Sequence, residues 1–144
     1  MNKKIGIVLV LSCMFFLSSC SLKSNSSKAS RAECMTNCAD SWNSSKSNAG
    51  RTEDEMNKEC SSICDANQGI KNQDENFCAK AEGTTRSDCY IEIAKNGKPE
   101  ACEKLEDKNA IADCYLSVVE KTGDKSICEK IMVSMVKDAC LENN

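Results

Sequence analysis

The sequence of 144 residues contains no histidine, one proline and few aromatic residues. Without histidine the chain has no Ser-His or Cys-His nucleophile pair and no imidazole ligand for a metal ion or haem. Cys-x-x-Cys spacing, which thiol-exchange enzymes use at a helix start, is also absent. Asp88 and Asp113 precede cysteines and could act as acids or bases, but we interpret them as residues on a helix surface. We expect a protein that is not an enzyme and that binds no cofactor.

Large apolar side chains are also scarce, and the positive charges are not concentrated in one segment. The net charge is −3, and lysine and glutamate are interspersed without a basic cluster. We therefore expect no nucleic-acid partner. Segments with the alternating pattern of β-strands are nearly absent, which predicts an all-α fold. A core this small needs covalent support, and the twelve cysteines can supply it.

The first twenty residues have the three parts of an export signal. Lys3 and Lys4 begin it, an apolar run follows from Ile5 to Leu17, and small residues precede Cys20. The apolar run is shorter than the ~20 residues of a membrane-spanning helix. We predict that residues 1–19 are a signal peptide, which would also remove Cys13.

Leu17-Ser18-Ser19-Cys20 resembles the lipobox of bacterial lipoproteins. The resemblance implies that Cys20 becomes the N-terminus, is lipidated with diacylglycerol and acylated again, for example with palmitate. Such a group would anchor the protein to a lipid bilayer of the bacterial cell envelope. Because Ser21 rather than Asp follows the cysteine, the resemblance implies the outer membrane if the host has two membranes.

Residues 20–30 are rich in serine and have no apolar periodicity, so we expect a flexible tether. Export places the ten remaining cysteines in an oxidising compartment, where disulfides persist.

Residues 31–70 are expected to form a helical hairpin. Cys34 and Cys38 are one helical turn apart, as are Cys60 and Cys64. The pairs Cys34 with Cys64, Cys38 with Cys60 and Trp42 with Met56 share one midpoint, near Ala49 and Gly50. An antiparallel hairpin turning there predicts the disulfides Cys34–Cys64 and Cys38–Cys60. Thr52 and Glu55 form a capping box that begins the second helix.

This spacing resembles the twin Cys-x3-Cys hairpins of small mitochondrial intermembrane-space proteins. The resemblance covers some thirty residues and implies an architecture with two nested disulfides. Because the loop of this chain is longer than the loop in those proteins, we do not extend their chaperone function to it. If the four thiols stayed reduced, they could instead bind zinc, although we expect no metal site in an oxidising compartment.

Residues 71–144 contain three similar units. Their opening cysteines, Cys78, Cys102 and Cys128, are 24 and 26 residues apart, and the closing cysteines are Cys89, Cys114 and Cys140. Such a period indicates short helix-turn-helix repeats that stack on one another. We call them unit 1, unit 2 and unit 3.

Each unit needs a break between its cysteines, because eleven or twelve helical residues span about 17 Å and a disulfide requires Cα atoms within about 7 Å. Unit 1 has Gly83 and a possible capping box of Thr85 with Asp88, unit 2 has Asp107 as N-cap, and unit 3 has only Ser134. Gly97 and Gly123 are expected to end the second helices of units 1 and 2. Tyr90 and Tyr115 are expected in the core.

Spacing favours bonds within the units, Cys78–Cys89, Cys102–Cys114 and Cys128–Cys140. A shifted scheme, Cys89–Cys102 and Cys114–Cys128, would link neighbouring units instead and remains open.

The sequence therefore predicts a membrane-anchored envelope lipoprotein that acts as a non-enzymatic binding or structural module. Its partner would be a protein or another envelope component. A purely structural or immunity role at the membrane would show the same sequence features as this binding role. The alternative is a cysteine-rich redox or metal-handling envelope protein, which would carry several reactive thiols.

Overall fold

The computed structural model describes residues 30–45 and 50–142, and these residues form helices and turns without a strand. The all-α fold predicted from the sequence is thus confirmed. The predicted signal peptide, Cys20 and the tether up to residue 29 lie outside the described residues, as do residues 46–49, which fall within the segment expected to join the two hairpin helices.

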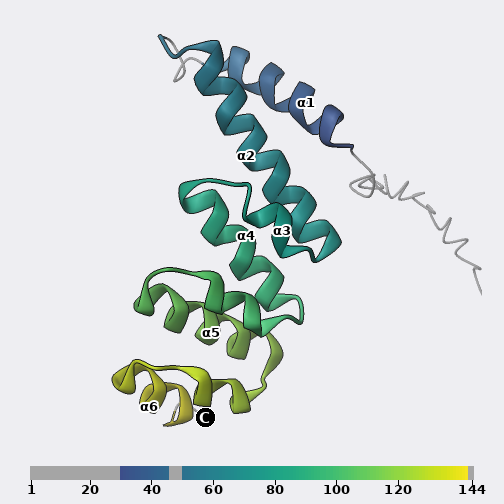
Figure 1. Cartoon of the computed structure of the whole chain (residues 1–144). Coiled ribbons are helices and arrows are strands. Elements are labelled where there is room, and N and C mark those ends of the chain that lie inside the picture. The colour runs from purple at the N-terminus through teal and green to yellow at the C-terminus, as the bar shows by residue number, and fades with distance from the viewer. Residues whose placement is uncertain (1–29, 46–49, 143–144) are drawn as a thin grey trace, which may run out of the picture.

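Helices follow one another in chain order along an elongated molecule (Figure 1). The hairpin helices α1 and α2 lie at one end and α6 at the other. The elements are α1 (Arg31–Ser44), α2 (Glu53–Asn72), α3 (Glu75–Cys78), α4 (Gly83–Lys95), the 3-10 helix η2 (Pro99–Lys104), α5 (Lys108–Thr122), the 3-10 helix η3 (Lys125–Lys130) and α6 (Ser134–Glu142).

The ends of the two hairpin helices are fixed by their own side chains. The Ser30 side chain accepts a hydrogen bond from the Glu33 backbone N–H and so begins α1. The capping box predicted for α2 is confirmed, with the Thr52 hydroxyl accepting from the Glu55 N–H and the Glu55 carboxylate accepting from the Thr52 N–H. Near the turn, the Arg51 guanidinium lies 4.2 Å from the centre of the Trp42 ring.

Helix α1 contributes no buried residue. Its contact with α2 therefore depends on the two disulfides and on polar contacts rather than on a hydrophobic seam. Within the part of the chain that the structure describes, the extensive contacts of α1 are with α2, so α1 lies in a single layer with α2.

In each repeat unit, a short first helix leads into a longer second helix. Unit 1 has a four-residue α-helix, α3, whereas units 2 and 3 have six-residue 3-10 helices, η2 and η3. The helical conformation is interrupted after each first helix, as the cysteine spacing requires. This interruption brings the Cα atoms of the two bonded cysteines of each unit to 5.5–5.8 Å from each other.

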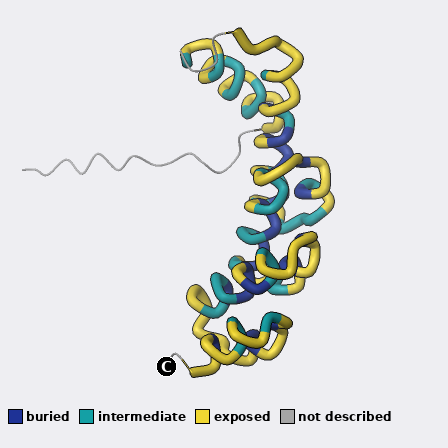
Figure 2. Tube along the Cα trace, turned by 90° about the vertical axis from the view of Figure 1, so that its left-hand side faces the viewer, coloured by how far each residue is buried: buried dark blue, intermediate teal, exposed yellow. Residues whose placement is uncertain are grey.

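The core runs through the middle of the stacked units (Figure 2). Cys78, Cys89, Cys102, Cys114 and Cys128 are fully buried, so the disulfides take the place of large apolar side chains. Few bulky residues, notably Ile93, Tyr115 and Val118, complete it. The covalent bonds therefore lie in the core itself.

Helix α2 extends past residue 70 and serves as the first layer of the stack. Ala66 belongs to the repeat core, and Gly69 lies against the Cys78–Cys89 disulfide. The Ser62 hydroxyl accepts a hydrogen bond of 2.8 Å from the Glu82 N–H. The hairpin and the repeats therefore share one helix.

The start of α4 corrects one prediction. The capping box of Thr85 with Asp88 is wrong, because α4 begins at Gly83 and its N-cap, Glu82, makes no side-chain capping bond. The bond from the Glu82 N–H to Ser62 places the helix start, so a contact with α2 overrides the local pattern. The other predicted ends agree: Asp107 caps α5, and Gly123 ends it with a φ of 72°. Gly97, with a φ of 111°, follows the end of α4.

Candidate binding surfaces

The structure bonds the ten described cysteines in five pairs, Cys34–Cys64, Cys38–Cys60, Cys78–Cys89, Cys102–Cys114 and Cys128–Cys140. These are the pairs expected from spacing, and the shifted scheme between neighbouring units is not formed. No cysteine in residues 30–45 or 50–142 is left as a free thiol.

The four hairpin cysteines considered as zinc ligands are therefore bonded to one another. In the described part of the chain, no cluster of three or more histidine, cysteine or acidic side chains is arranged to hold a metal ion. A search of the same residues finds no helix that is long and apolar enough to span a membrane.

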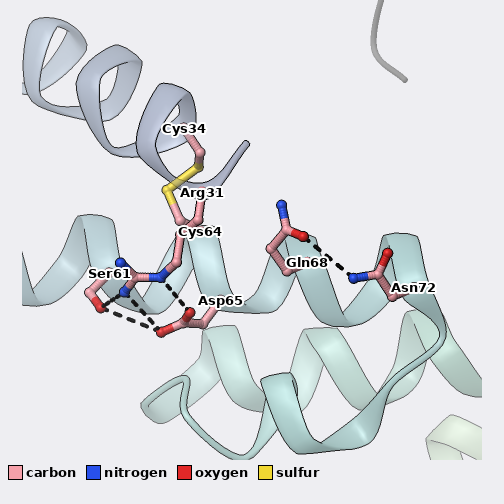
Figure 3. Close-up of polar contacts among 7 residues, drawn as sticks. All are labelled: Arg31, Cys34, Ser61, Cys64, Asp65, Gln68 and Asn72. Atoms are coloured by element: carbon pink, nitrogen blue, oxygen red, sulfur yellow. Dashed lines mark hydrogen bonds and ion pairs between the residues drawn. A yellow bond between two sulfur atoms is a disulfide. The ribbon is translucent and has the colours of Figure 1, made fainter. Parts of the chain in front are cut away.

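A polar cluster fastens the start of α1 to the middle of α2 (Figure 3). Arg31 Nε donates to Asp65 Oδ1 at 2.8 Å, and Arg31 Nη2 donates to Ser61 Oγ at 2.6 Å. The Asp65 side chain is only 9% exposed. The hydrogen bonds from Arg31 hold the pKa of Asp65 below its usual value although burial opposes this. The cluster adjoins Cys64, so the bond Cys34–Cys64 and the ion pair secure the same turn of α2.

Tyr90 and Tyr115 are 7% and 1% exposed, as expected of core residues. The Tyr115 hydroxyl donates to Glu103 Oε1 at 3.0 Å. Burial, together with the adjacent Glu103 carboxylate, raises the pKa of Tyr115 to about 12. The Lys130 ammonium of unit 3 lies 5.9 Å from the Tyr115 ring centre, so unit 3 helps to cover this face of unit 2.

The carboxylates that the sequence offers as acid or base candidates lie on the surface. Asp88 and Asp113 are both exposed on their helices. Neither aspartate is buried in a cavity where a desolvated carboxylate could act as a catalytic acid.

Unit 3 exposes large apolar side chains that the other units do not. Leu141 directly follows the closing cysteine, the position that Tyr90 and Tyr115 occupy in units 1 and 2, yet it is 41% exposed. Met132 and Met135 are 67% and 81% exposed. We call these three residues the terminal face. They lie in the last unit of the stack, at the end opposite the hairpin (Figure 1).

Aligning the three units shows that these methionines replace polar residues. Met132 corresponds to Glu82 and Glu106, which are both exposed. Counted back from the closing cysteine, Met135 corresponds to Thr84 and Asn109, which are also exposed. Within the described residues, no packing covers these methionines. Exposed large apolar residues at positions that are otherwise polar are candidates for an interaction site. Sequence reasoning missed this surface, although the alignment contains the signal.

A second surface is a groove of about 900 Å³ on one flank of the hairpin. Its lining includes Cys38 and Trp42 from α1 and Ile63 and Ile70 from α2. Ile63 is 36% exposed. Glu59 and Lys71 also line it. We call it the hairpin groove.

Comparison with protein-family models, curated proteins and solved structures finds no match to this chain. Its function is therefore inferred from the sequence signals and from these two surfaces.

Proposed function

We propose that this chain is a lipoprotein of the bacterial cell envelope, anchored through acylated Cys20, that binds a protein or another envelope component without catalysing a reaction. In a host with two membranes, the anchor would lie in the outer membrane. The proposed membrane anchor is supported by the N-terminal export signal and by the four residues that end in Cys20.

The binding half rests on one observation, the exposure of the terminal face. A stack buries the face of each unit against the next, as it does for Tyr90 and Tyr115. In unit 3 the corresponding Leu141 is exposed, and two positions that are polar in units 1 and 2 are occupied by Met132 and Met135. Methionine side chains adapt to different surfaces because they are unbranched and polarisable. The exposed Leu141 therefore suits a protein partner that supplies the apolar contact a further unit would make, and Met132 and Met135 offer that partner apolar contacts at positions that stacking leaves exposed in units 1 and 2.

The anchor is tested in the bacterial host by metabolic labelling with an alkyne-tagged fatty acid. The wild-type chain should be labelled and should sediment with membranes, while Cys20→Ser should lose the label and appear in the soluble fraction. Retention of label by the C20S chain would contradict the anchor.

The binding surface is tested with a photo-crosslinking residue, benzoylphenylalanine, placed at Met135 in the full chain in native envelopes. A discrete adduct is expected at Met135, and the same residue at Thr84, the matching exposed position of unit 1, should give none. Leu141→Glu should remove the Met135 adduct without changing the five disulfides. Equal adducts at both positions, or none at Met135, would count against this face.

A further inference from the structure

We propose that the hairpin groove is a self-association surface, into which a second copy of this chain packs its own groove about a two-fold axis. This interface is distinct from the terminal face and does not depend on it. The inference starts from the incomplete packing of the hairpin, since α1 buries no residue and the groove leaves Ile63 exposed. Two helices in one layer need a second layer to cover an apolar flank.

The charges of the groove identify the occupant. Glu59 and Lys71 both line it, and both are exposed. They are twelve residues apart on α2, about 18 Å along the helix axis. Residue 65 lies midway between them. A two-fold axis perpendicular to α2 at this level would make the two α2 helices antiparallel and bring each Glu59 toward the Lys71 of the other copy.

A two-fold interface is built from one surface patch that complements itself. Glu59 and Lys71 carry opposite charges and lie at equal distances from the two-fold axis. Each copy would therefore place its Glu59 opposite the Lys71 of the other copy, which gives one ion pair on each side of the axis. Such exposed ion pairs contribute little affinity, so the apolar contacts of Trp42, Ile63 and Ile70 would supply it and the ion pairs would set the register. Glu59 already pairs with Arg51 at 2.9 Å within its own chain, and its carboxylate has room for a second cation.

The groove lies clear of the Arg31 cluster. At 100° per residue, Ile63 and Asp65 point about 160° apart around α2. The ion pair of Arg31 with Asp65 therefore lies on the flank of α2 away from the groove, while Cys34, one turn later in α1, lines the groove itself. A second copy can therefore approach the groove without displacing the ion pair.

The test uses charge reversal in the full chain, purified in detergent, with mass measured by sedimentation equilibrium over a range of concentrations. The wild type should form dimers. Glu59→Lys and Lys71→Glu should each weaken the dimer at least about tenfold, because each places like charges opposite one another twice. The double variant E59K/K71E should recover the dimer.

The most discriminating experiment mixes the two single variants. E59K carries two positive and K71E two negative groove residues, so each should pair with itself only weakly, whereas the two variants together should form a mixed dimer. Asp54→Lys is the matched control, since Asp54 is an exposed acidic residue of α2 on the other flank, and it should leave the dimer unchanged. Intact-mass measurement and circular dichroism verify that each variant keeps its disulfides and helices.

A monomeric wild type at all concentrations overturns the proposal. So does a dimer that E59K and K71E weaken no more than D54K does, because the contact would then lie elsewhere. Failure of the mixed variants to pair, with both folded, overturns the two-fold arrangement.

Discussion

Gly69 packs so closely on Cys89 that a Cβ atom at position 69 would lie 2.9 Å from the Cys89 sulfur. The sulfur of Cys78, the disulfide partner of Cys89, would be 3.0 Å away. The Cys89 sulfur also lies 3.3 Å from the Ala66 carbonyl oxygen. Helix α2 thus approaches the first repeat disulfide at the level of its backbone, and this contact joins the hairpin to the stack.

Replacing Gly69 by Ala should destabilise the protein although alanine is the better helix former by about 1 kcal/mol. The added methyl group meets two bonded sulfur atoms that cannot move independently, and overpacking of this kind costs about 1–3 kcal/mol. Denaturant titration should show a net loss of stability for G69A. Asn57→Ala, at an exposed position of the same helix, should be neutral or slightly stabilising. A G69A chain as stable as N57A would show that α2 shifts freely on unit 1.

The features that could be predicted from the sequence are those with local causes. The Thr52 and Glu55 capping box, the Asp107 cap and the turn at Gly123 each depend on residues within one helical turn of one another. The cysteine pairs also follow from spacing, because a repeat fixes which sulfur atoms can meet. Cys20 lies outside the described residues, so its role stays a prediction from sequence.

The features that could not be predicted depend on contacts between distant segments. Ser62 and Glu82 are twenty residues apart, and their hydrogen bond moves the start of α4 to Gly83. Gly69 reads in the sequence as a weak point of a helix, whereas in the fold it gives the disulfide room. The terminal face required both the unit alignment and the measured exposure of Leu141.

The hairpin disulfides should be reduced before those of the repeats. Cys34 and Cys38 are partly exposed, whereas Cys102, Cys114 and Cys128 are fully buried. A dithiol reductant attacks an accessible sulfur as a thiolate, forms a mixed disulfide, and then closes its own ring while both cysteine thiols are released. Limited reduction followed by alkylation and peptide mapping should therefore label Cys34, Cys38, Cys60 and Cys64 first.

Reduction of those two bonds should also release α1, because α1 has no buried residue to keep it on α2. Hydrogen exchange should rise across Arg31–Ser44 while α4 and α5 stay protected. Equal labelling rates for all ten cysteines would contradict this order of reduction.

Two substitutions compare the predicted helix caps directly. The Asp107 side chain accepts hydrogen bonds from the N–H groups of Asn109 and Ala110 at 2.9 and 3.0 Å. Asp107→Ala should therefore cost about 0.5–2 kcal/mol. Thr85→Ala should change stability by less than about 0.5 kcal/mol, because Thr85 lies inside α4 and does not cap it. Thermal unfolding of both variants at one pH compares their losses of stability. A loss for T85A as large as that for D107A would indicate that Thr85 does cap the helix, against the structure.

The stability of the protein should fall as the pH rises from about 10 to about 12, through the ionisation of Tyr115. Its pKa in the folded state is raised to about 12 from an unfolded value of 10.0, with burial as the larger cause and Glu103 as the second. Below pH 10 the phenol is protonated in both states, and the contribution is fully present. Between pH 10 and pH 12 the Tyr115 hydroxyl is ionised in the unfolded chain but still protonated in the folded one. Each increase in pH within this range therefore favours unfolding.

Tyr115→Phe should remove this dependence, so the stability difference between the wild type and Y115F should shrink as the pH rises through that window. Glu103→Gln should narrow the window without abolishing it, because burial of the ring remains. The onset of tyrosinate absorbance gives an independent measurement, with one of the two tyrosines titrating near pH 12 in the folded wild type and at lower pH in E103Q. If Tyr115 ionises near pH 10 while the chain is folded, then its ring is not held beneath unit 3 as the structure places it.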